Sequence, residues 1–120
     1  MYDTADALYS FFSSFGLPAY VEYTVPVDAE LPYITYELRE PQAGEKSSLT
    51  ARVWYEDTGF AAVTRKVDEI KNSIGRGVSI PVERGAVWLW PDTHFCQFQR
   101  ADEPKLKIAY LMLIIGAYKF

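Results

Sequence analysis

The strongest constraint on the fold is an amphipathic segment that begins near residue 57. Its apolar side chains are spaced three, four, three and four positions apart, the period of one face of an α-helix: Phe60, Val63, Val67, Ile70 and Ile74. Asp57 or Thr58 can cap its start, and Gly75 and Gly77 stop it. Such a stripe most often covers the protein's own sheet, so we predict a helix packed on strands.

Three segments before this helix have the composition or alternation of strands. They are residues 19–27, 32–40 and 48–56. In the second, we expect one face to be polar (Thr35, Glu37, Arg39) and the other to be apolar (Ile34, Tyr36, Leu38). In the third, we expect one face to carry Leu49, Ala51, Val53 and Tyr55, and the other Thr50, Arg52, Trp54 and Glu56.

The segments after the helix also indicate strands. A short strand, a turn at residues 83–85 and a strand over 86–90 come first, and Pro91 is expected to end that strand. Residues 94–100 alternate again. The final apolar segment could be a helix started by Asp102 and Pro104, but the alternation of its first residues favours a strand.

A second, shorter helix is expected at the start of the chain. Asp3 or Thr4 can cap it, and Gly16 is expected at its C′ position. Four apolar side chains share one face: Leu8, Phe11, Phe12 and Phe15. The 120 residues therefore predict one α+β domain, residues 1–120, with a mostly antiparallel sheet and two helices packed against it.

Composition excludes several classes of protein. With 49% hydrophobic and 23% charged residues, the chain is not of the disordered type. The single cysteine rules out an intramolecular disulfide, and the absence of a basic N-terminal region predicts that the chain is not secreted but cytosolic. The longest apolar run, residues 108–118, is too short for a bilayer, so we expect no membrane partner.

Charge is distributed unevenly along the chain. Residues 1–60 hold ten acids and three bases, and residues 61–120 hold six acids and nine bases. The overall net charge of −4 argues against binding of a nucleic-acid backbone. The two halves differ enough for one face of a subunit to attract another face of its neighbour, although chance placement on a solvated surface would look the same.

The residue types needed for catalysis are scarce. His94 and Cys96 are the only histidine and cysteine, and on one strand they would point to the same face. Only Asp92 lies near enough in sequence to orient the imidazole, so a cysteine hydrolase is a weak hypothesis. Two such residues are too few for a zinc site, and no phosphate-binding motif is present. We therefore expect neither an enzyme nor a cofactor.

Several motifs together carry a resemblance. They are "LPYITYEL", the polar loop "EPQAGEKSS", "ARVWYED" leading into the helix "FAAVTRKVDEIKNSIGRG", and then "VERGAVWLWPDTHFCQF" with a terminal apolar strand. In this order the chain, from about residue 17 to its end, resembles the tail terminator (tail completion) proteins of siphophages. Related small proteins are often described as minor capsid or head-tail joining components.

The resemblance implies an assembly role. It predicts a homo-oligomeric ring, with the hexamer as its candidate form, that caps the tail tube protein and presents a surface to the head completion or connector protein. It places the chain in the virion neck after assembly in the bacterial host cytoplasm. A small ligand-binding or regulatory α+β module, using an aromatic pocket, remains the alternative.

We select candidate interface residues on this basis. Aromatic residues are enriched at protein interfaces, and the chain has three tryptophans and nine tyrosines. For the ring, the candidates lie on the more polar sheet face: Glu37, Arg39, Arg52 and Trp54. For tube or connector, they lie in two polar loops, the first expected to be mobile: Gly44, Glu45 and Lys46, and then Arg100 and Asp102.

Overall fold

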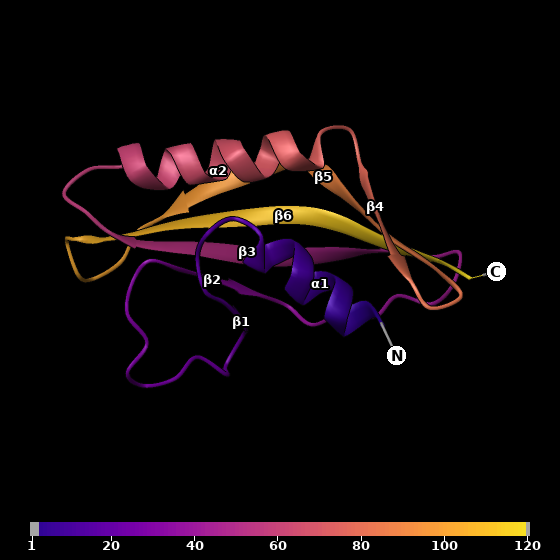
Figure 1. Cartoon of the computed structure of the whole chain (residues 1–120). Coiled ribbons are helices and arrows are strands. Elements are labelled where there is room, and N and C mark those ends of the chain that lie inside the picture. Colours follow the sequence, from indigo (N-terminus) through magenta and orange to yellow (C-terminus); the bar gives the residue numbers. More distant parts are fainter. Residues whose placement is uncertain (1–2, 120) are drawn as a thin grey trace.

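The protein has the α+β class that the sequence predicts, with two helices on a mostly antiparallel sheet, and the computed structural model describes residues 3–119 (Figure 1). Within these residues the sheet has six strands and not seven, because the predicted strands 86–90 and 94–100 belong to one continuous strand. The elements in chain order are α1 (Thr4–Ser13), β1 (Ala19–Val21), β2 (Tyr33–Tyr36), β3 (Lys46–Glu56), α2 (Ala61–Ile74), β4 (Val78–Val82), β5 (Gly85–Gln99) and β6 (Leu106–Lys119). The strands form one sheet in the order β1-β2-β3-β6-β5-β4. β1 and β2 pair in parallel and every other neighbouring pair is antiparallel.

Both helices cover the same face of this sheet. The stripe of α2 and the aromatic face of α1 join one core cluster with the inward residues of the two central strands, such as Val53 of β3 and Leu111 of β6. α1 contributes Phe12, which stacks on Tyr36 with ring centroids 4.8 Å apart. In Figure 1, α2 runs along the top of the sheet and the loop between β1 and β2 hangs below it. The second face of the sheet carries no helix among the described residues.

The helix boundaries differ in part from those the sequence predicts. Asp3 caps α1 through a capping box with Asp6, but the C-cap is Ser14, so Gly16 lies beyond the C′ position. α2 has no side-chain cap and begins at Ala61. The Asp57 carboxylate accepts a hydrogen bond from the N–H of Thr58, which lies three positions before the first helical residue. Asp57 therefore does not cap the N-terminus of α2.

Phe60 is not part of the buried stripe of α2, contrary to the prediction. It lies at the N-cap, is 45% exposed, and contacts Phe98 edge-on with ring centroids 5.3 Å apart. The other four stripe residues are buried: Val63, Val67, Ile70 and Ile74.

The first two strands are shorter than their patterns predict. β1 ends at Val21, and the residues that continue its pattern, Tyr23 and Val27, are fully exposed. β2 ends at Tyr36, so Leu38 is 55% exposed rather than buried. Thr35 is buried although its side chain points away from the helices, because it contacts Trp54.

β3 begins at Lys46, inside the predicted polar loop, and its alternation is as predicted, with Leu49, Ala51 and Val53 fully buried. The end of that loop is held in place. Gly44 donates its N–H to the carbonyl of Ala117 at 2.8 Å, and Ala43 forms a bridge with the same residue. The loop therefore docks on the last part of β6.

Pro91 does not end a strand. β5 runs through it, with a register shift between Pro91 and Cys96 opposite β6. β4 pairs only with residues 85–89 of β5, so the missing N–H of Pro91 falls beyond β4 and costs no ladder bond there. The final segment is a strand, as favoured, and the turn at residues 83–85 joins β4 to β5.

Candidate interface on the open sheet face

The sheet face without helices is here called the open face. Its residues alternate with the core residues and are matched across the strands by register: Tyr20, Tyr33, Thr35, Lys46, Ser48, Thr50, Arg52, Trp54, Glu56, Ser79, Pro81, Ala86, Trp88, Trp90, Gln97, Gln99, Leu106, Ile108, Tyr110, Met112, Ile114, Gly116 and Tyr118. Antiparallel sheets usually have a polar solvent face. This face is instead rich in aromatic and aliphatic side chains, most of them half-buried.

Arg52 and Trp54 lie side by side on this face, as predicted. The Arg52 guanidinium makes a 2.7 Å ion pair with Glu22, donates to the side-chain oxygen of Gln99 at 3.3 Å, and lies 4.8 Å from the ring centroid of Tyr110. Trp54 donates its indole N–H to the hydroxyl of Thr35 at 2.9 Å. These bonds hold both side chains in a fixed orientation, which lowers the entropic cost of contact with a partner.

Glu37 and Arg39 form a separate group beyond the end of β2. The Glu37 carboxylate accepts hydrogen bonds from the N–H and the hydroxyl of Thr50, at 2.7 and 2.6 Å, and pairs with Arg39 at 3.2 Å. Burial raises the pKa of Glu37, but the bonds from Thr50 and Arg39 outweigh it, so the pKa lies below its usual value. Glu37 is thus fully engaged within its own chain.

The two candidate loops lie at opposite ends of the sheet. Gly44, Glu45 and Lys46 are exposed beside the C-terminal part of β6, since Lys46 is opposite Gly116. Arg100 and Asp102 are exposed in the turn between β5 and β6, next to the pair Gln99 and Ile108. The candidates selected from sequence therefore form four groups and not one patch.

The sequence reasoning missed an aromatic cluster near the first loop. Trp88 and Trp90 stack with ring centroids 5.9 Å apart, Tyr118 meets Trp88 edge-on at 6.0 Å, and the ammonium of Lys46 lies 4.8 Å from the Trp90 centroid. We call these four residues the tryptophan platform. The alternation in "AVWLW" places both tryptophans on one face, but only the pairing with β6 brings Tyr118 and Lys46 to them.

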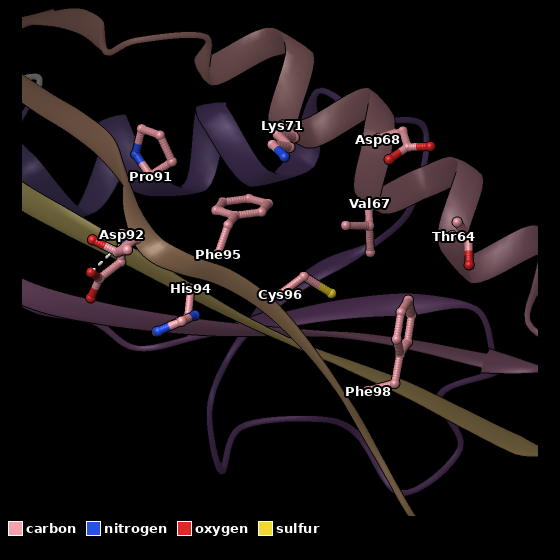
Figure 2. Close-up of a pocket in the computed structure, with 11 residues that line it drawn as sticks. Thr64, Val67, Asp68, Lys71, Pro91, Asp92, His94, Phe95, Cys96 and Phe98 are labelled. Atoms are coloured by element: carbon pink, nitrogen blue, oxygen red, sulfur yellow. Dashed lines mark hydrogen bonds between the residues drawn. The ribbon is translucent and has the colours of Figure 1, made fainter.

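His94 and Cys96 lie in a groove of about 500 Å³ between α2 and β5. Their side chains point in different directions, and Phe95 lies between them (Figure 2). The irregular register of β5 removes the same-face relationship expected on a regular strand. Burial, and then the charge of Asp68, raise the pKa of the Cys96 thiol, while Lys71 opposes this shift. The thiol is thus not activated, and this geometry gives the hydrolase hypothesis no support.

No group of three or more potential metal ligands occurs within residues 3–119. Among those residues, none of the helices has the length and apolar character needed to cross a membrane.

Comparison with known proteins identifies a shared fold. No protein-family model matches the sequence, and no curated protein matches it significantly. Among solved structures, a chain from the virion of a native gene transfer agent particle is similar over 98% of both chains, with a TM-score of 0.66 and 15% sequence identity. At this identity the likeness defines the fold: this chain has the fold of a virion chain from end to end.

Proposed function

We propose that the protein is a structural component of a phage-type particle and that it acts by assembly rather than by catalysis. The observation that carries this proposal is the end-to-end likeness to a gene transfer agent virion chain, with 98% of each chain covered. The order of sequence motifs, which resembles siphophage tail terminators, points independently in the same direction.

The specific role we propose is that of a tail terminator. Copies of the chain form a ring on the end of the tail tube, with six subunits as the resemblance implies, and offer the opposite side to the head connector. Two features support this role. The open face leaves apolar side chains for a partner to cover, and the acidic first half and basic second half of the chain suit head-to-tail contacts.

The candidate residues fit distinct contacts in this scheme. Arg52 and Trp54 lie on the open face and are available to a neighbouring subunit, with Glu37 and Arg39 at its margin. The two exposed loops lie at opposite ends of the sheet. Gly44, Glu45 and Lys46 therefore suit one axial partner, and Arg100 and Asp102 suit the other. This separation is what a protein between tube and connector requires.

Removal of the chain from the phage or prophage that encodes it tests the proposal. We expect free heads together with tails of extended and variable length, because nothing would stop tube growth. Negative-stain electron microscopy measures both. Expression of the wild-type chain in trans should restore joined particles with uniform tails, whereas a frame-shifted copy should not. Joined particles with normal tails in the deletion strain would refute the role.

A further inference from the structure

The loop between β1 and β2, residues 22–32, exposes side chains that its sequence pattern would bury. Tyr23 and Val27 are fully exposed, and Tyr23 has a positive φ of 66°, a backbone conformation that non-glycine residues seldom adopt. The loop carries Glu22, Asp28 and Glu30 and no basic residue. We call this segment the acidic arm. In Figure 1 it hangs below the sheet at the β1 edge.

β6 is apolar on both of its faces, although helices cover only one face of the sheet among the described residues. Its inward residues are apolar, and so are the alternate residues Ile108, Tyr110, Met112 and Ile114 on the open face. Strands that are apolar on both faces are typical of sheets covered on both faces. Within residues 3–119, only one face of this sheet is covered by helices. The open face is therefore expected to be covered in the assembled state.

The tryptophan platform is the part of this face best suited to bind an arm. Its rings are held by stacking, and Trp90 fits closely between Gly77 and Gly116, where a Cβ would lie 2.7 and 3.0 Å from the indole. Lys46 is the charged side chain that lies on these rings. A fixed aromatic surface with a cation suits a segment that presents apolar and acidic side chains.

We propose that the acidic arm of one copy binds the tryptophan platform of the next copy in the ring. The chain already has one ion pair between the arm and the open face. At the base of the arm, Glu22 pairs with Arg52 at 2.7 Å. Asp28 and Glu30 would meet Lys46 of the neighbour, and Tyr23 and Val27 would meet its indole rings. The inference rests on the proposed ring and names the surfaces that join its subunits. It moves Lys46 from the axial contact to the contact between subunits, and leaves Gly44 and Glu45 to the axial partner.

Measured from backbone to backbone, the arm falls short of the platform of its own chain. Trp90 and Tyr33 are separated by three strand spacings and six residues along the strands, about 25 Å by standard sheet dimensions. Val27 is six residues from Tyr33 and reaches about 20 Å when fully extended. Arm and platform are thus two different patches of one subunit, and a head-to-tail contact between two such patches generates a ring when the rotation closes.

Cysteine cross-linking tests the contact. Val27→Cys and Ser79→Cys are combined on a Cys96→Ser background, since Ser79 is exposed on β4 directly opposite Trp88 of the platform. A short bismaleimide is added to the purified chain over a concentration series that reaches its solubility limit. We expect a ladder of dimers, trimers and larger species on denaturing gels. Each single-cysteine variant can give dimers at most. No species above dimer from the double variant would overturn the inference.

Charge exchange provides the second test. Lys46→Glu should lower the ladder yield by about fivefold or more, and Asp28→Lys with Glu30→Lys in the same chain should restore it. Circular dichroism of each variant checks that the fold is retained. If Lys46→Glu leaves the yield unchanged, the ladder does not arise from the proposed contact.

Failure of this contact is distinguishable from failure of the proposed function. If the chain restores uniform tails in the deletion strain but gives no ladder, the proposed function is supported and the proposed contact is refuted. If the chain gives a ladder but has no effect on tails, the proposed contact is supported and the proposed function is refuted.

Discussion

The indole of Trp90 lies directly against Gly116, and a Cβ at residue 116 would be 3.0 Å from Cζ3 and 3.2 Å from Cη2 of that ring. Gly77 approaches the other end of the same indole, where a Cβ would be 2.7 Å from Cδ1. The two glycines therefore make room for a large aromatic side chain that lies flat on the open face. The orientation of the tryptophan platform depends on both of them.

Gly116→Ala should displace Trp90 and destabilise the protein. The added methyl group would be too close to the indole, and the ring cannot move away because Gly77 lies against its other end. We therefore expect a loss of about 1–3 kcal/mol in the free energy of unfolding. Urea denaturation followed by tryptophan fluorescence measures it. Gly59→Ala is the matched control, because a Cβ at residue 59 meets nothing within 4 Å. Equal stability of the two variants would show that the ring is not confined in this way.

Glu37 should make stability depend on pH in the acidic range. Its pKa in the folded protein is lowered from 4.5, so its ionised form stabilises the fold above the unfolded pKa, and this contribution is lost as the pH falls through the folded value. Glu37→Gln should cost about 1–2 kcal/mol at neutral pH and progressively less in acid. Chemical denaturation at a series of pH values measures both. The exposed Glu40→Gln is the control, and a wild-type and a Glu37→Gln curve that run parallel at all pH values would contradict the assignment.

Thr35 should contribute to stability although it faces away from the helices. Thr35→Val removes the acceptor for the indole N–H of Trp54, which lies 2.9 Å away, and we expect a loss of about 1 kcal/mol. Thr93→Val, at an exposed position of β5, should change the free energy of unfolding by less than about 0.5 kcal/mol. Thermal unfolding of the two variants is a sufficient comparison. A neutral Thr35→Val would mean that the hydrogen bond adds nothing to the fold.

Cys96 should react slowly with thiol reagents while the protein is folded. Burial and the nearby Asp68 raise its pKa, so little thiolate is present at neutral pH. We expect labelling by a disulfide reagent to be at least about tenfold slower than in the urea-unfolded chain at the same pH. Fast labelling of the folded protein would indicate an activated thiol and would reopen the hydrolase hypothesis.

The sequence predicts the class and most of the core because local periodicity determines them. The spacing of Val63, Val67, Ile70 and Ile74 is enough to place the buried face of α2, and the alternation in β3 is enough to orient Leu49 and Arg52 on opposite faces. These are properties of single elements. No knowledge of neighbours in space is required to find them.

Pairing between distant strands was not predictable in the same way. Pro91 is compatible with a continuous β5 only because β4 stops pairing before it, and Tyr118 and Lys46 reach Trp88 and Trp90 only through β6. In the acidic arm, the lack of a pairing partner prevents a strand that the local pattern favours. Its strand-like pattern continues to Val27, but no neighbouring strand is available beyond Val21 to pair with it.

The decisive test of the proposed role in the particle is to localise the chain within intact particles. An epitope-tagged chain that restores uniform tails would be detected by gold-labelled antibody on purified particles, with the tag alone as control. We expect label at the junction of head and tail, together with peptides of this chain in the particle proteome. Purified particles that carry neither label nor peptides of this chain would contradict it.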